Sequence, residues 1–131
     1  MSRLSFCKSS RLGGRKEFES VLAGRVRVSD RLLAVYAAKN DIGKARLGIS
    51  ISRSLGSAVM RNRMKRLIRE AFRLNQEKIA GIDYVVMPAP GYVNAVNEPE
   101  EGRKVFKKTT FGEVEKSFLS LARRASEKIG Y

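Results

Sequence analysis

Three stretches of the chain repeat apolar residues every three or four positions, which is the period of a helix that packs one face on a core. The first, 15–23, is followed by Gly24 as a stop signal, and the second, 58–79, is preceded by Ser57 as an N-cap. The third begins with Thr110-Phe-Gly-Glu113, which has the form of a capping box. The pattern therefore predicts one short helix and two long ones.

Apolar segments of a different kind lie between these helices and predict strands. Residues 46–52 alternate, with Leu47 and Ile49 on one side and Gly48 and Ser50 on the other. A sheet face of glycine and serine is small and polar, so it is either exposed to solvent or the floor of a groove. The expected strands span 25–28, 31–39, 46–52 and 83–87.

The order of the elements predicts one α+β domain over 1–131, with helices packed on a small sheet. Residues 1–12 are polar and basic, and we expect them to form a flexible arm. Residues 88–109 contain all three prolines, and we expect a long loop that is dispensable for folding. The unit 46–87 has the form of a crossover between parallel strands, and such crossovers are right-handed in almost all proteins.

The charge of the chain is strongly positive and unevenly distributed. Lys and Arg number 27 against 13 Asp and Glu, a formal net charge of +14, and +13 of it falls in residues 1–73. A basic surface confined to one part of a chain is typical of a protein that binds a polyanion such as nucleic acid.

The composition also excludes several kinds of chemistry. The chain has no histidine and one cysteine, Cys7, which excludes histidine catalysis, an internal disulfide and a Cys-rich zinc site. The longest apolar run, 32–38, is far too short to span a bilayer, and the N-terminus lacks the apolar core of a secretory signal. We therefore expect a cytoplasmic protein without a membrane span.

The helix expected over 58–79 has an apolar face and a basic face when its residues are placed at intervals of about 100°. Like charges four positions apart, such as Lys65 and Arg69, repel each other, and a bound anion would screen that repulsion. Most of the cations are arginines, whose planar guanidinium pairs with a phosphate at two points. A solvated basic face and a helix on a membrane surface are the alternatives. The second has less support because the apolar face lacks Trp and is suited to packing on the sheet.

This helix contains Arg61-Asn62-Arg63-Met-Lys-Arg-Leu-Ile-Arg69, which resembles the Arg-Asn-Arg signature of the bacterial ribonuclease P protein subunit. The preceding segment, Gly48-Ile-Ser-Ile-Ser-Arg-Ser-Leu-Gly-Ser-Ala-Val-Met60, is similar to the strand and connecting loop of that family. Shorter matches are Arg11-Leu12, Glu17-Phe18 and Gly24. The resemblance covers most of residues 11–87. It implies an α-β-β-β-α-β-α sandwich with a four-stranded sheet, like the second domain of ribosomal protein S5, and a rare left-handed crossover that the general statistics oppose.

The resemblance also implies a function. The protein would bind a large catalytic RNA, ribonuclease P RNA, and assist the Mg²⁺-dependent endonucleolytic removal of the 5′ leader from precursor tRNA. The chemistry and the Mg²⁺ would belong to the RNA subunit, so we expect no catalytic residue and no metal site in this chain. Glu98, Glu100 and Glu101 would form at most a weak, loop-borne metal site. We expect a monomer when free and one protein per RNA in the complex.

The contacts of the family correspond to two sets of residues here. The basic helix and the segment before it would contact the RNA subunit, and the sheet with the first helix would hold the single-stranded leader. The RNA-subunit set is Arg53, Arg61, Asn62, Arg63, Lys65, Arg66, Arg69 and Arg73. The leader set is Phe18, Tyr36, Arg46 and Ser50. Core packing is the alternative role for Phe18, whereas Tyr36 has a stronger case because it shares its face with small residues.

The sequence departs from the family before and after the basic helix. Ser54 stands at a position where the family has a second lysine, and Pro88-Ala89-Pro90 stands where the family often has a basic run. The loop that follows is longer than usual, and its cations are candidates to replace the missing charge. These cations are Arg103, Lys104, Lys107 and Lys108. Three rival functions share parts of the pattern: a structural RNA-binding protein of ribosomal type, a self-contained nuclease and a DNA-binding regulator.

Overall fold

The structure, a computed structural model, describes residues 10–24 and 26–131. Its elements in chain order are α1 (Arg15–Ala23), β1 (Val26–Ser29), β2 (Leu33–Ala38), β3 (Arg46–Ile49), the 3-10 helix η2 (Arg53–Leu55), α2 (Ala58–Asn75), β4 (Asp83–Pro88), α3 (Pro90–Val96), α4 (Gly102–Lys108) and α5 (Phe111–Ile129). Each helix and strand predicted from the hydrophobic pattern is present. However, α2 ends at Asn75 instead of residue 79, and residue 25 of the first predicted strand lies outside the described residues.

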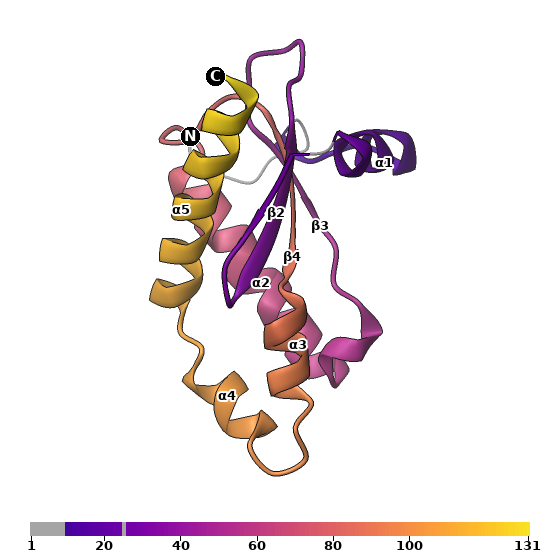
Figure 1. Cartoon of the computed structure of the whole chain (residues 1–131), viewed down its shortest axis with the longest axis vertical. Helices are drawn as coiled ribbons and strands as arrows, with labels where there is room; N and C mark the ends of the chain where they lie inside the picture. The colour runs from indigo at the N-terminus through magenta and orange to yellow at the C-terminus, as the bar shows by residue number, and fades with distance from the viewer. Residues whose placement is uncertain (1–9, 25) are drawn as a thin grey trace.

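The four strands form one sheet in the order β1-β2-β4-β3 (Figure 1). β1 and β2 form an antiparallel hairpin. In its turn, the Asp30 carboxylate accepts the backbone N–H groups of Leu32 and Leu33 at 2.8 and 2.9 Å. β4 pairs antiparallel with β2 and parallel with β3, so α2 connects two parallel strands as predicted. The α+β fold with a four-stranded sheet is confirmed.

One face of the sheet is covered by α2 and α5 and forms the main core. The Phe118 ring of α5 meets the rings of Phe72 on α2 and Tyr84 on β4 edge to face, with centroids 6.4 and 6.1 Å apart. The predicted capping box of Thr110 and Glu113 begins α5. Because the apolar sides of α2 and α5 are buried on the sheet, their polar sides face outward.

The opposite face of the sheet is covered at one end by α1, and Figure 1 shows α1 and α5 on opposite sides of the strands. The Phe18 ring of α1 packs directly over Gly48, because a Cβ placed on Gly48 would lie only 2.5 Å from Phe18 Cε2. The small residue at position 48 is therefore a packing site for α1. Beyond α1, the same face carries Tyr36, Ser50 and Met87, which are half-buried.

The prediction of a flexible arm over 1–12 is wrong for its last residues. Residues 1–9 lie outside the described residues, but Ser10 is buried, and Arg11 forms a parallel β-bridge with Leu47. The backbone N–H of Leu12 donates to the Leu47 carbonyl at 3.1 Å. Residues 10–12 therefore extend the β3 edge of the sheet.

The prediction of a long loop over 88–109 is also wrong, because this segment contains α3 and α4. Pro90 does not interrupt α3, since it stands in the first turn, where a proline needs no amide hydrogen bond. Tyr92, Val96 and Phe106 are buried, and the Tyr92 hydroxyl hydrogen-bonds the Thr109 hydroxyl at 2.7 Å. Burial raises the pKa of Tyr92. The segment packs on the core, so we now expect its removal to lower the stability of the fold.

Candidate nucleic-acid interface

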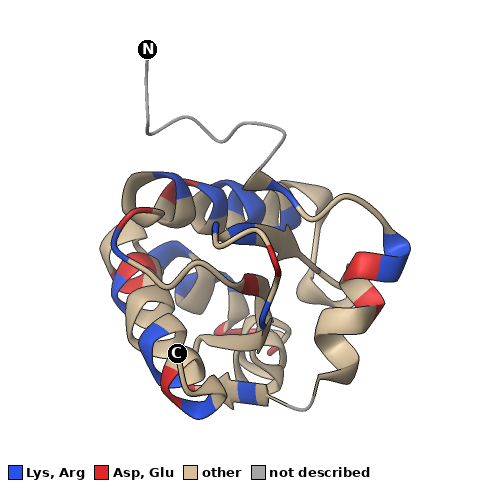
Figure 2. Cartoon of the chain, turned by 90° about the horizontal axis from the view of Figure 1, so that it is seen from above, with Lys and Arg blue, Asp and Glu red and all other residues tan. Residues whose placement is uncertain are grey.

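The outward side of α2 presents a continuous basic face. Its buried side, which includes Met64, Ile68 and Phe72, packs in the core. Asn62, Arg66 and Arg69 on the other side are exposed, and Lys65 is half-buried. Figure 2 shows the Lys and Arg residues of α2 in a row along the helix.

The most exposed arginines of this face have their charge available. Among the residues that the structure describes, no carboxylate forms an ion pair with Arg66 or Arg69. Glu70, the only acidic residue of α2, instead binds Arg73 at 2.6 Å, and this hydrogen bond lowers the pKa of Glu70. The face therefore offers guanidinium groups to an external anion.

Two other cations of the predicted RNA-subunit set stand at the N-terminal end of α2. Arg53 is exposed on η2. Arg61 is half-buried, and its Nη1 donates to the backbone carbonyls of Arg53 and Gly56 at 3.2 and 3.1 Å. Arg61 therefore stabilises the turn that leads into α2.

Arg63 is half-buried beneath α4, a contact that the sequence did not indicate. Its Nη2 donates to the Thr109 carbonyl at 3.2 Å, and its guanidinium carbon lies 5.2 Å from the centre of the Phe106 ring. Its Nη1 is buried without a hydrogen-bond partner among the described residues. In the free protein this guanidinium binds α4, and its role toward RNA stays a prediction.

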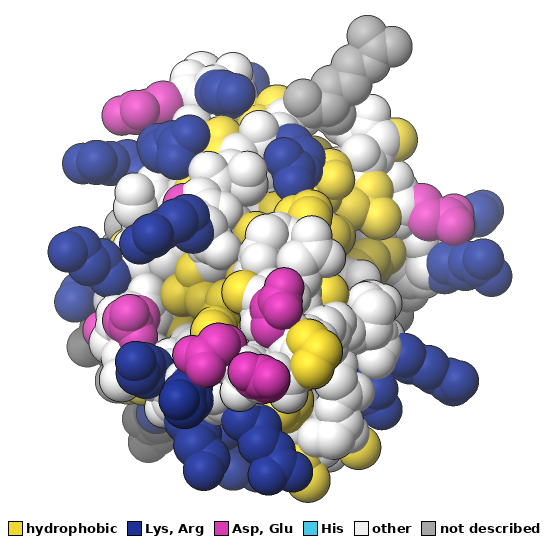
Figure 3. Space-filling view, turned by 60° about the horizontal axis from the view of Figure 1, so that its bottom comes forward, with side chains coloured by type: hydrophobic (Ala, Val, Ile, Leu, Met, Phe, Trp, Pro, Cys, Tyr) yellow, Lys and Arg dark blue, Asp and Glu magenta, His cyan; other side chains and the backbone are white. Residues whose placement is uncertain are grey.

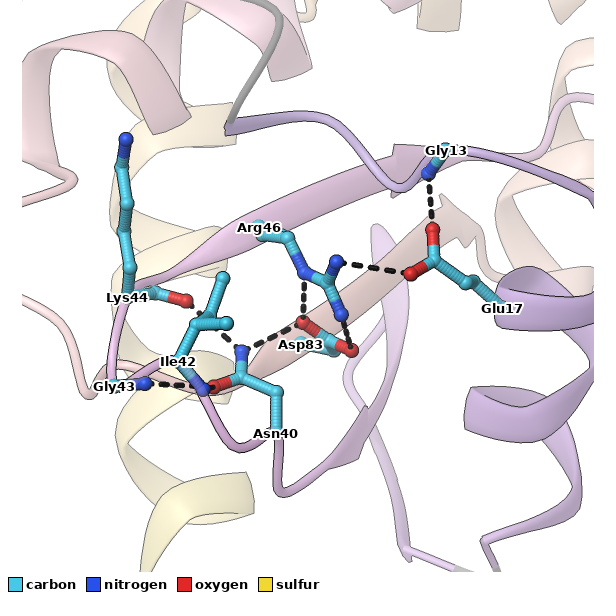
Figure 4. Close-up of polar contacts among 8 residues, drawn as sticks. All are labelled: Gly13, Glu17, Asn40, Ile42, Gly43, Lys44, Arg46 and Asp83. Atoms are coloured by element: carbon cyan, nitrogen blue, oxygen red, sulfur yellow. Dashed lines mark hydrogen bonds and ion pairs between the residues drawn. The ribbon is translucent and has the colours of Figure 1, made fainter.

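Arg46, from the predicted leader set, lies at the centre of a polar network (Figure 4). Its Nε and Nη2 donate to the two carboxylate oxygens of Asp83 at 2.8 and 2.9 Å, and its Nη1 donates to Glu17 at 2.9 Å. Glu17 also accepts the backbone N–H of Gly13 at 2.6 Å, and this bond together with Arg46 lowers the pKa of Glu17. Asn40 donates to Asp83 at 2.8 Å. The network joins α1 to β3 and β4, which gives Arg46 a structural role.

Tyr36 stands on the part of the sheet that α1 leaves uncovered. Arg27 lies directly opposite it in the β1–β2 register, with its guanidinium carbon 5.7 Å from the centre of the Tyr36 ring. Arg27 is exposed, and sequence reasoning missed it. The alternation of residues 25–28 could have identified it, because a β-hairpin between 25–28 and 31–39 brings this outward position next to Tyr36.

The predicted sets thus fall on two separate surfaces. The RNA-subunit set follows α2, which covers the core face of the sheet. Of the leader set, Tyr36 and Ser50 lie on the opposite face, where the Ser50 backbone N–H pairs with the Val86 carbonyl at 3.0 Å. Phe18 is half-buried against Gly48, which supports its alternative packing role.

Two further features are absent from residues 10–24 and 26–131. No group of three or more Cys, Asp or Glu side chains in these ranges comes together in a way that could hold a metal ion. No helix in the same ranges has the length and apolar composition needed to cross a membrane.

Comparison with known proteins gives concordant results from sequence and structure. The family model described as Ribonuclease P matches residues 6–126. The ribonuclease P protein component of Methylococcus capsulatus is 45% identical over 95 residues, which cover 70% of this chain and 74% of that protein. The protein of the same name from Syntrophus aciditrophicus is 30% identical over 105 residues, covering 80% and 88%.

Solved structures with the same fold come from the same kind of protein. The RNase P protein from Thermotoga maritima superimposes with a TM-score of 0.72 at 30% identity, covering 87% of this chain and 96% of that one. The Staphylococcus aureus RNase P protein gives a TM-score of 0.69 at 28% identity, covering 90% and 96%.

Proposed function

The chain belongs to the ribonuclease P protein family, and from this premise we propose that the exposed face of α2 binds ribonuclease P RNA while the uncovered sheet face binds the leader of precursor tRNA. As a member of this family the chain is a protein subunit of the ribonuclease P holoenzyme. It functions with ribonuclease P RNA in tRNA processing.

The observation that carries the RNA-subunit proposal is the outward side of α2. Arg66 and Arg69 are exposed and have no carboxylate partner among the described residues, while the opposite side of the same helix is buried in the core. A core-anchored helix holds its outward cations at fixed spacings, which is the arrangement needed to bind successive phosphates. Asn62 and Lys65 complete this face.

The leader proposal is supported by the chemistry around Tyr36. The half-buried ring offers a flat surface for stacking an unpaired base, and the adjacent Arg27 guanidinium can pair with a phosphate. Such contacts have little base preference, which suits a leader of variable sequence. Ser50, the residue that follows β3, is a polar group on the same face.

The remaining parts of the proposal concern the reaction. We propose that the RNA subunit supplies the chemistry and binds the Mg²⁺, while this chain holds RNA and substrate in register and reduces phosphate repulsion. One protein would bind one RNA and one precursor tRNA, and the complex would act in the cytoplasm, where precursor tRNA is processed.

The α2 surface is tested by the double variant Arg66→Gln/Arg69→Gln assembled with ribonuclease P RNA. Each lost phosphate contact should lower the slope of log affinity against log salt concentration by about 0.7–0.9, so the pair should lower it by about 1.4–1.8. The matched control is Arg123→Gln/Lys128→Gln, which removes the same charge from exposed positions on α5. Equal slopes for the wild type and the α2 variant would refute the assignment of this face.

The leader surface is tested by Tyr36→Ala in the reconstituted holoenzyme. Because only precursor tRNA carries a leader, loss of one stacked base should weaken precursor binding by about 1–3 kcal/mol, roughly 5- to 150-fold, and leave mature tRNA binding unchanged. Cleavage of precursor tRNA at low Mg²⁺, with and without the protein, gives the functional readout. Equal losses for both tRNAs, together with a lower melting temperature, would identify Tyr36 as a packing residue instead.

A further inference from the structure

A pocket with a basic rim lies between α2 and α4, beside the exposed face of α2 that carries Arg66 and Arg69. Its volume is about 460 Å³. No acidic residue lines it among the described residues, and one wall is apolar. Its lining includes Val59, Met60, Arg63, Arg103, Phe106 and Lys107.

The α4 side of this pocket is unusually rich in positive charge. Of the seven residues of α4, four are Lys or Arg and none is acidic. Lys104 pairs with Glu101 at 3.5 Å, but no carboxylate within the described ranges forms an ion pair with Arg103 or Lys107, and both are exposed. Figure 3 views this end of the molecule and shows Lys and Arg side chains gathered beside a group of acidic ones.

The position of Arg103 argues against a purely intramolecular role for these charges. Lys107 and Lys108 stand in the last turn of α4, where a cation interacts favourably with the helix dipole. Arg103 stands in the first turn, where the dipole opposes a cation, and it lies four positions from Lys107, so the two charges repel. A bound anion would relieve both unfavourable interactions.

α4 is held against α2 by contacts that fix the shape of the pocket. The Phe106 ring packs under the Arg63 guanidinium, and Thr109 accepts from Arg63 through its backbone carbonyl. The Thr109 hydroxyl also bonds Tyr92 at 2.7 Å and donates to the Val105 carbonyl at 2.9 Å. α4 covers Arg63, and at the same position Arg103 and Lys107 of α4 present positive charge at the surface.

We propose that this pocket is a phosphate-binding site for the backbone of the RNA subunit, and that it extends the α2 interface onto α4. The proposal rests on the proposed function of α2. The RNA subunit is favoured over the leader because the pocket is built on α2 itself, whereas Tyr36 lies on the opposite face of the sheet. Arg103 and Lys107 would bind the phosphate.

The test is the double variant Arg103→Gln/Lys107→Gln in the full chain, titrated with ribonuclease P RNA over a range of salt concentrations. We expect the salt slope to fall by about 1.4–1.8, which corresponds to a roughly 25- to 60-fold loss of affinity at about 0.1 M salt. The control Arg123→Gln/Lys128→Gln should retain the wild-type slope. The exchange variant Arg103→Lys/Lys107→Arg keeps both charges and should retain most of the affinity. Thermal melts of all variants show whether each one is folded.

The result that overturns the proposal is a wild-type slope for the α4 variant while Arg66→Gln/Arg69→Gln lowers the slope, and this result leaves the proposed function of α2 intact. Normal affinity for the RNA subunit with weaker binding of precursor tRNA would also overturn it, because the two cations would then belong to the substrate interface. If neither double variant changes the slope, the proposed function of α2 and the α4 site both fail.

Discussion

Replacing Gly48 by alanine tests how α1 is seated on the sheet. The added methyl group would lie 2.5 Å from Phe18 Cε2 and 2.9 Å from both Phe18 Cζ and Leu12 Cδ1. Carbon atoms in favourable contact lie about 3.5–4.0 Å apart, so α1 or the Phe18 ring must move by about 1 Å. The half-buried ring can tilt toward solvent, which limits the strain. We expect Gly48→Ala to lower the free energy of unfolding by about 1–3 kcal/mol and the melting temperature by about 3–12 °C.

The test is a double-mutant cycle that combines Gly48→Ala with Phe18→Ala. Denaturant and thermal unfolding give the free energy of unfolding of each variant. Without the ring the methyl group has room, so Gly48→Ala should cost much less in the Phe18→Ala background, and the coupling energy should exceed about 1 kcal/mol. Gly112→Ala is the control. At that position in α5 the nearest atom to a new Cβ is 3.9 Å away, so the variant should be neutral or more stable.

Equal costs of Gly48→Ala with and without the Phe18 ring would refute this reasoning. Such a result would mean that Phe18 does not rest on Gly48 in solution, and the ring would then be free to contact a leader. The cycle therefore separates the packing role of Phe18 from the binding role that the family resemblance implies.

Three further substitutions test contacts that the sequence did not reveal. Because the folded protein holds the pKa of Glu17 below its ordinary value of about 4.3, the stabilisation from this carboxylate is present above that pH and is lost as pH falls through the folded pKa. Glu17→Gln should therefore have a lower melting temperature than the wild type at pH 7, and melts at decreasing pH should show this difference shrinking below the ordinary pKa. Asp83→Asn removes the bidentate carboxylate partner of the Arg46 guanidinium, whose side chain is only 19% exposed, and leaves it paired with Glu17 alone. The variant should cost about 2–3 kcal/mol in a denaturant titration, whereas the exposed Asp41→Asn should cost almost nothing. Phe106→Ala removes a ring of a residue that is 7% exposed and should cost about 3 kcal/mol; a loss below about 0.5 kcal/mol would show that α4 does not pack on the core.

The regular elements could be predicted because each has a strong local signal. The period of apolar residues and the caps at Ser57 and Thr110 identify α2 and α5, and both side-chain caps are present in the structure. The segment 88–109 misled because its prolines suggest a loop, while α3 and α4 have only seven residues each. Two turns are too short to establish a helical period. Their stability comes from tertiary packing of Tyr92 and Phe106.

The availability of each cation could not be predicted in the same way. The helical wheel correctly placed Arg66 and Arg69 outward, because that position depends only on local geometry. It could not show that Arg46 binds Asp83, which is 37 positions away, or that Arg63 binds Thr109, which is 46 positions away. Intramolecular partners of this kind are set by topology. A count of charges therefore overestimates how many arginines can bind RNA.

The difference between free and occupied arginines also determines which variants can separate RNA binding from stability. Arg66 and Arg69 project from a helix whose other side holds it in the core, so their loss should change affinity and leave the melting temperature unchanged. Arg61 and Arg63 bind backbone carbonyls of their own chain, at Gly56 and Thr109. Replacing Arg61 would also disturb the turn before α2, and replacing Arg63 would also displace α4. A loss of RNA affinity in either variant would therefore combine a lost RNA contact with a change in the fold. Of these two pairs, only Arg66 and Arg69 can therefore measure the interface itself. Any role of Arg63 must be inferred from an affinity loss larger than its effect on folding explains.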